Sequence, residues 1–543
     1  MNIRKLSVEK VLIALISAGF IIWSAVFIYS SSFIAVDGNR YFALFDDAMI
    51  SMRYAWNFSH GSGLVWNPGE YVQGYTNLLM TLLMSFATFI FGKSAAVLFI
   101  QISGAVFILA IAYLSMKITG IITRDADPRH RSLVGVLSFL CAVSYYPLVY
   151  WSLMGMETGL LALLVTAGVW AALTYGIGGK PRHLFLTALY LGLAYLTRND
   201  SIIFAMLVWV YLVWEIPMMR TSRAGMYRLL SATAVYFLFV AGQTAFQYLY
   251  YGEILPNTYT LKLTGMPLTA RIENGLRFVK PFLSVTAPIL VLPALDVVFD
   301  FRKRKLLLLF IFFSALVYQV YVGGDPWNYW RMMSPAMPLV AILFVSALSA
   351  LVLALSDTRF FSDYCLRNPV FPGRRMAGFL VVAMTVVGLL SANLRFLPEI
   401  LFLEKPYTAE SNRDNVNTAI VLNRLTTDSA TVGVYWAGTI PYFTDRRAVD
   451  FLGKTDRYIA HLPPDVSGSV SWFCMKSVPG HNKYDLDYSI RKLQPTYVQG
   501  FQWGAQDVSQ WAETRYVKVE HGGVGLFLLK DSSDVLWNKI TAS

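Results

Sequence analysis

The chain has 543 residues, of which 56% are hydrophobic and only 14% are charged, and its mean hydropathy is +0.50. This composition excludes an ordinary soluble protein and indicates a chain that lies in a lipid bilayer. The formal net charge of +12 does not indicate nucleic-acid binding, because Lys and Arg lie mostly in short links between apolar segments and form no single basic face. We therefore expect membrane lipids, and no nucleic acid, as partners.

Eleven apolar segments are candidate membrane-spanning helices. A span needs about 20 mostly apolar residues, because lipid offers the backbone no hydrogen-bond partners. The candidates are residues 11–30, 95–116, 133–151, 156–176, 184–197, 201–217, 229–250, 281–299, 307–322, 335–356 and 377–395. The first resembles a signal peptide, but it is long and ends without a small-residue cleavage pattern, so we expect it to be retained.

Basic residues indicate which side of the membrane each loop faces, because Lys and Arg near the ends of spans favour the cytoplasm. They concentrate in the loops 117–132, 177–183, 218–228, 300–306 and 357–376. We expect these loops to be cytoplasmic and the intervening loops to lie outside. A span at the apolar residues 78–91 would place the basic loop 117–132 outside, so we expect a juxtamembrane or re-entrant helix there.

The tail differs in composition from the rest of the chain, with frequent charged and polar residues punctuated by Gly and Pro. Helical spacing over residues 415–425 is followed by a strand-like run at 431–436. We therefore expect two domains: a transmembrane domain at 1–395, with outer loop one at 31–94, and a small extracytoplasmic α/β domain at 396–543.

Outer loop one carries the adjacent carboxylates Asp46 and Asp47 in a stretch rich in acids, amides, aromatics and glycines. An acid pair can serve a reaction in which a hydroxyl loses its proton: one carboxylate accepts it, and the other orients the acceptor or holds a divalent cation. No other cofactor is indicated. The plain alternative is that the pair caps a helix and complements its dipole. If Asp47 caps a helix over 48–58, Arg53 and Asn57 lie together on it.

Further polar residues are candidates for substrate binding. A turn-rich stretch of loop one leads into polar groups that suit sugar hydroxyls, namely Gln73, Tyr75, Thr76 and Asn77. Compact clusters in the other outer loops contribute Glu157, Arg198, Asp200, Asn257, Lys262, Asp325 and Arg331. Charged residues at span ends are often interfacial anchors, but their recurrence on one side favours a site. Arg198, Lys262 and Arg331 suit a phosphate or pyrophosphate, which predicts an anionic lipid-linked ligand.

Several motifs carry a resemblance to a known family. Loop one reads Asp-Asp-Ala-x-Ile-Ser-x-Arg-Tyr-Ala and then Gly-x-Gly-Leu-Val-Trp-Asn-Pro-Gly-Glu-x-Val-x-Gly-Tyr-Thr-Asn. The likeness continues in Gly-Met-Glu-Thr-Gly (155–159), Thr-Arg-x-Asp (197–200), Tyr-Gly-x-x-Leu-Pro-Asn-Thr (251–258), Gly-Gly-Asp…Arg (323–331) and Ala-Gly-x-Ile-Pro-Tyr (437–442). This pattern resembles the AftB-like arabinofuranosyltransferases of the GT-C superfamily.

The resemblance implies a GT-C-type helical membrane fold and a transfer of arabinofuranose from a polyprenyl-phosphate donor, notably decaprenylphosphoryl arabinofuranose. Asp46 would be the catalytic base or an acceptor-binding acid, and Asp47 its partner. Arg198, Lys262 and Arg331 would contact the donor phosphate. The base assignment presumes inversion at the anomeric carbon, and the sequence does not distinguish inversion from retention.

The composition of the chain also indicates its host. The chain is rich in Ile, Phe, Lys, Asn and Ser rather than in the Ala, Arg and Gly of mycobacterial proteins. We therefore expect the inner membrane of a Gram-negative host, with a cell-envelope glycan or pilin as acceptor.

A transporter or flippase of lipid-linked sugars remains an alternative, although it predicts ionisable residues in mid-span and the span middles are mostly apolar. An assembly factor whose tail binds envelope partners is a further alternative.

Overall fold

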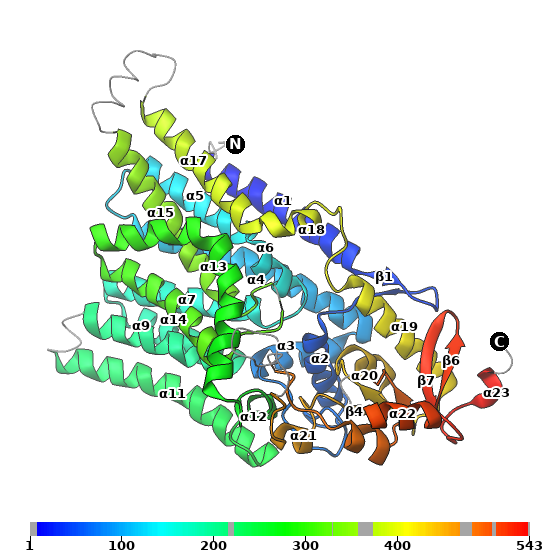
Figure 1. Ribbon diagram of the computed structural model, residues 1–543. Helices are drawn as coiled ribbons and strands as arrows, with labels where there is room; N and C mark the ends of the chain where they lie inside the picture. Colours follow the sequence, from blue (N-terminus) through cyan, green and yellow to red (C-terminus); the bar gives the residue numbers. More distant parts are fainter. Residues whose placement is uncertain are drawn as a thin grey trace.

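The computed structural model describes residues 8–215, 222–327, 329–356, 373–466, 480–501 and 506–540. Long helices form a bundle, and a smaller layer of mixed helices and strands adjoins one end of it, at the lower right of Figure 1. The predicted fold class, a helical membrane part with a small C-terminal α/β part, is confirmed.

All eleven candidate spans are helical in the structure. They correspond to α1 (Val8–Ser31), α4 (Lys93–Ile122), α5 (Pro128–Ser144) with α6 (Tyr146–Leu153), α7 (Thr158–Gly178), α8 (Pro181–Thr197), α9 (Ile202–Glu215), α11 (Arg223–Tyr251), α13 (Leu268–Phe299), α14 (Lys303–Val322), α15 (Met337–Ser356) and α17 (Gly373–Asn393). Among the described residues, eight helices are long and apolar enough to cross a membrane, and α5 with α6, bent by 52°, would make a ninth span. The count of eleven stays a prediction, because α8 has 17 residues and α9 has 14 described residues.

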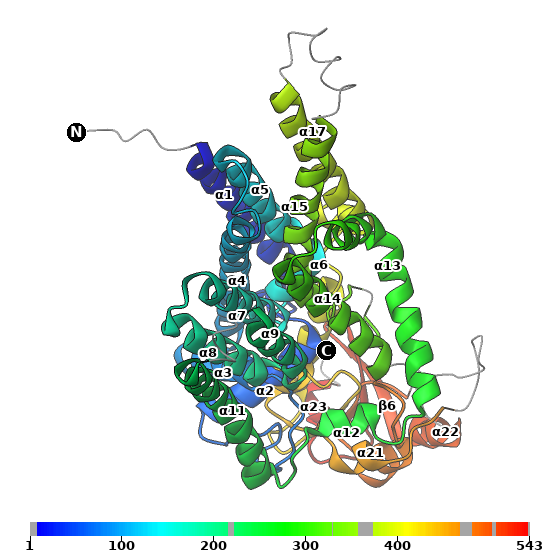
Figure 2. The same ribbon diagram turned by 90° about the vertical axis from the view of Figure 1, so that its left-hand side faces the viewer.

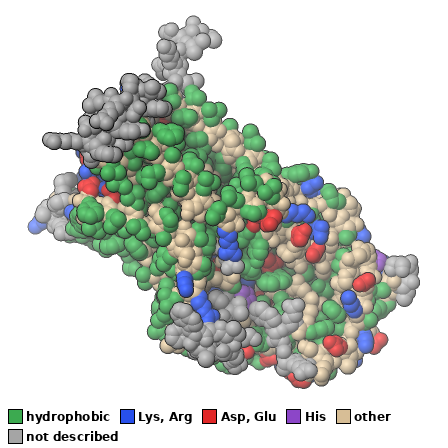
Figure 3. Space-filling model, turned by 45° about the horizontal axis from the view of Figure 1, so that its top comes forward, with side chains coloured by type: hydrophobic (Ala, Val, Ile, Leu, Met, Phe, Trp, Pro, Cys, Tyr) green, Lys and Arg blue, Asp and Glu red, His purple; other side chains and the backbone are tan. Residues whose placement is uncertain are grey.

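Apolar side chains cover much of the bundle surface, as the green area of Figure 3 shows for one face. Leu249, Phe299 and Phe379 are 82%, 85% and 70% exposed. Such a surface would associate or aggregate in water, whereas lipid chains solvate it. The protein is therefore a multi-pass membrane protein.

The predicted inner and outer loops separate to opposite ends of the bundle. At one end, Arg302 pairs with Asp125 at 2.9 Å, which joins the links after α4 and α13. At the other end, Arg331 pairs with Asp47 at 3.0 Å, which joins the link after α14 to loop one. Residues 218–221 and 357–372 of the predicted inner loops lie outside the described residues. We call the end that contains Asp47 the loop-one end; which end faces the cytoplasm stays a prediction.

The apolar stretch after loop one forms α3 (Leu78–Ile90), and the expected helix is confirmed. Its 13 residues measure about 20 Å at 1.5 Å per residue, which is shorter than the hydrocarbon core of a bilayer, about 30 Å. Helix α3 packs against α2 (Asp46–Ser59) at the loop-one end. This length suits a helix that does not cross the membrane alone.

The C-terminal region, by which we mean residues 396–543, contains a five-stranded mixed sheet. Its strand order is β4 (Arg447–Asp450), β3 (Thr431–Val434), β5 (Tyr497–Val498), β7 (Val524–Leu529) and β6 (Tyr516–His521). Strand β3 runs parallel to β4 and β5, with Val432 opposite Ala448, and β7 runs antiparallel to β5 and β6. The predicted helix and strand both occur, as α19 (Ala409–Leu425) and β3. The domain boundary at 395/396 stays a prediction.

Short elements at the loop-one end connect the two parts. They are the hairpin β1 (Phe33–Ile34) and β2 (Arg40–Tyr41), α12 (Asn257–Leu263), α18 (Leu397–Ile400), α20 (Thr439–Thr444) and α21 (Arg457–His461). Helices α12 and α21 lie side by side, as Figures 1 and 2 show. Helix α22 (Gln506–Arg515) contacts strand β6, and α23 (Trp537–Ile540) follows strand β7. These contacts place the C-terminal region directly against loop one.

Candidate active site

A cavity of about 450 Å³ lies at the loop-one end, where α2, α12 and the ends of α9, α13 and α14 meet. Part of its wall is apolar and includes Ile203, Leu263 and Val322. The charged residues of its lining are Asp47, Glu157, Arg198, Asp200, Lys262, Arg271, Asp325, Arg331 and Lys454. These four acids and five bases leave one positive charge in excess among the described residues. The cavity therefore offers an apolar surface beside a group of charges.

Asp47 lies in the first turn of α2, but it does not cap this helix. The N-cap is Phe45, and no side chain makes a capping hydrogen bond there. One carboxylate oxygen of Asp47 accepts from the Arg331 guanidinium at 3.0 Å, and the other pairs with the Lys454 ammonium. Burial raises the pKa of Asp47, but the Lys454 and Arg331 cations outweigh burial and hold this pKa well below its usual range. Asp47 is therefore an ionised carboxylate held between two cations.

Arg331 is shared between two carboxylates. Its second terminal nitrogen donates to Asp325 at 3.1 Å, and its guanidinium lies 5.6 Å from the ring centre of Trp151. Gly323 is the C-cap of helix α14, and its φ of +94° is a conformation that favours glycine. The chain turns there, which brings Asp325 within hydrogen-bond distance of Arg331. Burial raises the pKa of Asp325 although Arg331 opposes this shift.

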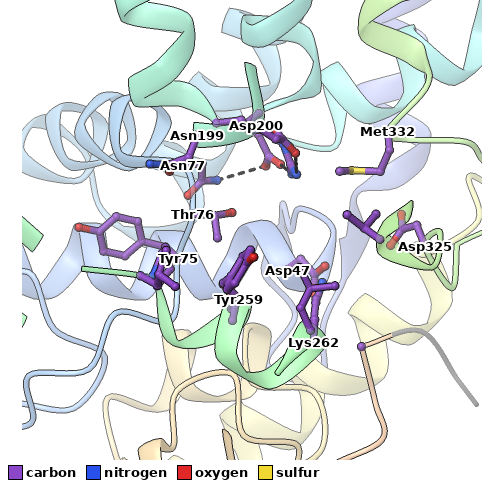
Figure 4. Close-up of a pocket in the computed structure, with 18 of the residues that line it drawn as sticks. Asp47, Tyr75, Thr76, Asn77, Asn199, Asp200, Tyr259, Lys262, Asp325 and Met332 are labelled. Carbon is purple, nitrogen blue, oxygen red and sulfur yellow. Dashed lines mark hydrogen bonds and ion pairs between the residues drawn. The ribbon is translucent and has the colours of Figure 1, made fainter. Parts of the chain in front are cut away.

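Lys262 projects from α12 beside Asp47 in Figure 4. Within the described parts of the chain, its ammonium makes no ion pair or hydrogen bond. Burial lowers the pKa of Lys262 to about 8, with Asp47 opposing the shift. A buried cation that forms no direct ion pair with these residues is suited to receive an anion.

Arg198 has its donors occupied by two acids. It donates to Glu157 at 2.8 Å and to both oxygens of Asp200 at 2.6 and 3.0 Å. The amide of Asn77 donates to the second oxygen of Glu157 at 3.3 Å. Figure 4 shows Asn77 and Asp200 across the cavity from Lys262. This network fixes the far wall and leaves Arg198 less available to a phosphate than Lys262.

Ten of the predicted site residues line one cavity. They are Asp47, Tyr75, Thr76, Asn77, Glu157, Arg198, Asp200, Lys262, Asp325 and Arg331. The other five, Asp46, Arg53, Asn57, Gln73 and Asn257, are absent from the described lining of this cavity. Their roles in catalysis or substrate binding stay predictions.

These five residues instead contact neighbouring backbone. Arg53 donates to the carbonyls of Trp66, Pro441 and Arg446. Asn57 donates to the Trp66 carbonyl as well, so the expected neighbours Arg53 and Asn57 do lie together. The backbone carbonyl of Gln73 accepts a hydrogen bond from the backbone N–H of Asn257. The polar side chains of α2 therefore hold loop one and the C-terminal region in place.

Asp46 faces the C-terminal region rather than the cavity. One oxygen accepts from the Gly438 amide at 3.1 Å, and the other accepts from the Thr439 amide at 2.9 Å and the Thr439 hydroxyl at 3.1 Å. Adjacent residues of one helical turn point in different directions, which separates the two carboxylates. The pair thus divides into a contact with the C-terminal region and a residue of the cavity wall.

Sequence reasoning missed Lys454 and gave no role to Gly438 and Thr439. The motif at 437–442 was part of the family resemblance, but nothing in it indicated a contact with Asp46. Lys454 follows strand β4 as a lone basic residue in the polar tail. Only the packing of the tail against loop one reveals its role.

The described residues do not fit a divalent cation at the acid pair. No group of three or more His, Cys, Asp or Glu side chains occurs among them that could hold a metal. Both oxygens of Asp47 are paired with cations, and both oxygens of Asp46 accept from N–H or O–H donors. The acid pair therefore offers no unoccupied carboxylate oxygen to a metal ion in this arrangement.

Comparisons with known proteins complete this description. A family model described as a domain of unknown function (DUF8728) matches residues 405–528. No curated protein matches the sequence. Among solved structures, ArnT from Cupriavidus metallidurans bound to undecaprenyl phosphate has a TM-score of 0.56 at 11% identity, covering 96% of this chain and 98% of its own.

Two further structures are similar at greater distance. The oligosaccharyltransferase AglB from Archaeoglobus fulgidus, in complex with an inhibitory peptide and a dolichol-phosphate, has a TM-score of 0.52 at 10% identity, covering 98% of this chain and 75% of its own. The arabinosyltransferase EmbB from Mycobacterium smegmatis has a TM-score of 0.42 at 11% identity, covering 73% and 43%, and this likeness is too weak to indicate the sugar. On the first two similarities, the protein shares the fold of ArnT and AglB over nearly its whole length.

Proposed function

We propose that the protein transfers a sugar from a polyprenyl-phosphate donor to an acceptor outside the cytoplasm. The observation that carries this proposal is the cavity at the loop-one end, where Lys262, which forms no ion pair with the described residues, lies beside Asp47 and next to an apolar wall. ArnT and AglB, which share the fold, were solved with undecaprenyl phosphate and dolichol-phosphate. Their ligands support a lipid phosphate as the group that this cavity receives.

The charges of the cavity support a phosphodiester donor. Such a donor carries one negative charge, and the lining has one positive charge in excess. Lys262 is free to contact the phosphate, whereas Arg198 already engages Glu157 and Asp200. The apolar wall from α9 and α14 provides contact for the first isoprene units of the lipid.

Asp47 is our candidate base, with the direct displacement as the simplest route. The acceptor oxygen attacks the anomeric carbon, the bond from that carbon to the phosphate oxygen breaks, and its electron pair leaves on the phosphate. The hydroxyl proton moves to a carboxylate oxygen of Asp47. Lys454 and Arg331 keep Asp47 ionised, so its carboxylate is available to accept the proton of the acceptor hydroxyl.

The sugar that we propose is arabinofuranose, on the resemblance of loop one to AftB-like enzymes, and the acceptor is an envelope glycan or pilin in a Gram-negative inner membrane. The test uses the full chain in proteoliposomes with decaprenylphosphoryl arabinofuranose. Envelope glycans and pilin from a deletion strain serve as acceptors, and mass spectrometry identifies the product. We expect a pentose on one of these acceptors with the wild-type protein and none with Asp47→Asn.

Two results would contradict the proposal. One is a deletion strain whose glycans and pilin carry the same sugars as the parent. The other is a purified protein that binds decaprenylphosphoryl sugars but moves them between leaflets without transferring the sugar, as a flippase would. Transfer of a different sugar only would support the proposed reaction and reject arabinofuranose as the sugar.

A further inference from the structure

The loop after strand β4 presents Lys454 to the cavity from a rigid turn. Asp450 accepts from the amides of Leu452 at 3.0 Å and Thr455 at 2.8 Å, so its carboxylate closes the turn on both sides. Gly453 has a φ of +76°, and a Cβ there would lie 2.5 Å from Ile459. The backbone on either side of Lys454 is therefore fixed within the C-terminal region.

The same turn is held from the membrane part by α12. The side-chain amide of Asn257 donates to the carbonyls of Gly453, Lys454 and Asp456 at 3.0, 3.1 and 3.1 Å. Loop one also abuts the turn, because a Cβ on Gly74 would lie 3.0 Å from the Lys454 carbonyl. Lys454 thus has a fixed position relative to both α12 and loop one.

Asp46 and Asp47 both bind the C-terminal region, through different groups. Asp46 accepts from the Gly438 and Thr439 amides, and Asp47 pairs with the Lys454 ammonium. A Cβ on Gly438 would lie 2.1 Å from the Asp46 carbonyl oxygen, so this approach requires glycine. The first turn of α2 is therefore a docking surface and a cavity wall at the same time.

We propose that the C-terminal region, most of which matches a domain of unknown function, completes the catalytic site, with Lys454 as the positioning residue whose ion pair holds the Asp47 carboxylate at the cavity. This inference rests on the proposed role of Asp47. It makes the region a working part of the active site rather than an accessory domain.

A comparison within the cavity supports the role of Lys454. Asp325 and Asp47 are both buried and both pair with Arg331. Among the described residues, Asp325 forms an ion pair with Arg331 alone and its pKa is raised by burial, whereas Asp47 also pairs with Lys454 and its pKa is lowered. The other charges that face Asp47 are Lys262, Asp46 and Asp325. Lys454 is the cation that distinguishes the two carboxylates.

The test measures the protonation of Asp47 directly, without sugar transfer. A hydrophobic carbodiimide modifies protonated carboxyl groups, and peptide mass spectrometry gives the fraction of Asp47 modified at each pH in nanodisc-embedded protein. In Lys454→Met and Lys454→Gln we expect modification to begin about 1 to 3 pH units higher than in wild type, because an opposite charge in contact shifts a carboxyl pKa by that much. Lys454→Arg keeps the cation and restores the wild-type profile.

Lys483 provides the matched control. It is a buried lysine of the same region whose ammonium donates to the carbonyls of Thr260 and Ala460 at 3.0 and 2.7 Å, so it also ties the region to α12. Lys483→Met should leave the Asp47 profile unchanged even where it lowers the melting temperature. An unchanged profile in both neutral variants of Lys454, or an equal shift in Lys483→Met, would overturn the proposal.

Sugar transfer by the same variants separates this inference from the proposed function. With transfer established, Lys454→Met should lower kcat more than it raises the donor KM and move the acid limb of the pH profile upwards, with rescue by Lys454→Arg. If the modification profile shifts but the protein transfers no sugar, the proposed function is rejected and the role of the Lys454–Asp47 ion pair is supported. Normal transfer by full-length Lys454→Met, with an unshifted acid limb, would reject the role of the region.

Discussion

Asp47 and Lys454 are separated by 407 residues in the sequence and form an ion pair in the wall of the cavity. The pair joins loop one to the C-terminal region at the point where the donor and acceptor would meet. It accounts for an otherwise unexpected feature, a buried carboxylate that stays ionised. This pair and the neighbouring contacts lead to five predictions.

Asp47→Asn should abolish transfer without abolishing lipid binding. The amide keeps the shape of the side chain but cannot accept the proton, and general-base catalysis contributes about 100-fold or more. The change also leaves Lys454 and Arg331 without their shared counter-charge, so undecaprenyl phosphate should bind at least as tightly as it does to wild type. Initial rates of transfer and a binding titration measure the two effects. Turnover within a few-fold of wild type would contradict the role of Asp47.

Asp46→Asn should weaken the docking of the C-terminal region. The amide has one acceptor oxygen, while Asp46 accepts from three donors on Gly438 and Thr439. A buried donor without a partner costs about 1 to 3 kcal/mol. Thermal unfolding in detergent and hydrogen exchange over residues 438–444 report this loss. Asp445→Asn is the control, because Asp445 makes an ion pair with Lys93 but is 53% exposed, and a pair of this kind contributes about 1 kcal/mol or less.

The affinity for undecaprenyl phosphate should fall as the pH rises through about 8. Lys262 has a pKa of about 8, so it loses its charge above that pH and binds the phosphate less well. The phosphate itself changes little there, because its second pKa is about 6. Lys262→Arg stays charged and should remove this pH dependence. Binding measured from about pH 7 to about pH 9.5 tests the prediction.

Lys262→Gln gives the complementary comparison. Loss of a charge-assisted hydrogen bond of about 1.5 to 3 kcal/mol should weaken binding by roughly 10-fold or more. Lys117→Gln, at the opposite end of the bundle, removes the same charge and should have no such effect. Equal losses in the two variants would indicate a general charge effect rather than a phosphate contact.

Gly438→Ala should uncouple the C-terminal region from α2. Its φ of −99° is open to alanine, so the conflict is steric: the Cβ would lie 2.1 Å from the Asp46 backbone oxygen and 2.8 Å from the Met49 Cβ, and neither atom can move without shifting the helix. We expect a lower melting temperature and a large loss of transfer. In Gly500→Ala the nearest atom would be 3.9 Å away, and this variant should resemble wild type. A fully active Gly438→Ala protein would show that close docking is not needed.

Much of the cavity could be predicted because clusters of charged and polar residues recur in the loops on one side of the spans. The clusters at 155–159, 197–200 and 323–331 each follow or precede an apolar segment, and alternation of basic loops placed them at one end. Their side chains were therefore expected together before any contact was known. The division of Asp46 and Asp47 was not predictable, because the direction of each carboxylate depends on which surface packs against the first turn of α2.

The sequence by itself determined the membrane class, the positions of the helices and the sidedness of the polar clusters relative to one another. These properties depend on the length of apolar segments and on local charge, which are local in the chain. Only the tertiary structure decided that Lys454 meets Asp47, that Arg331 is shared with Asp325 and that Lys262 has no ion pair within the described part of the chain. Such pairings depend on how distant segments pack, and a buried charge gains its partner only when that packing is complete.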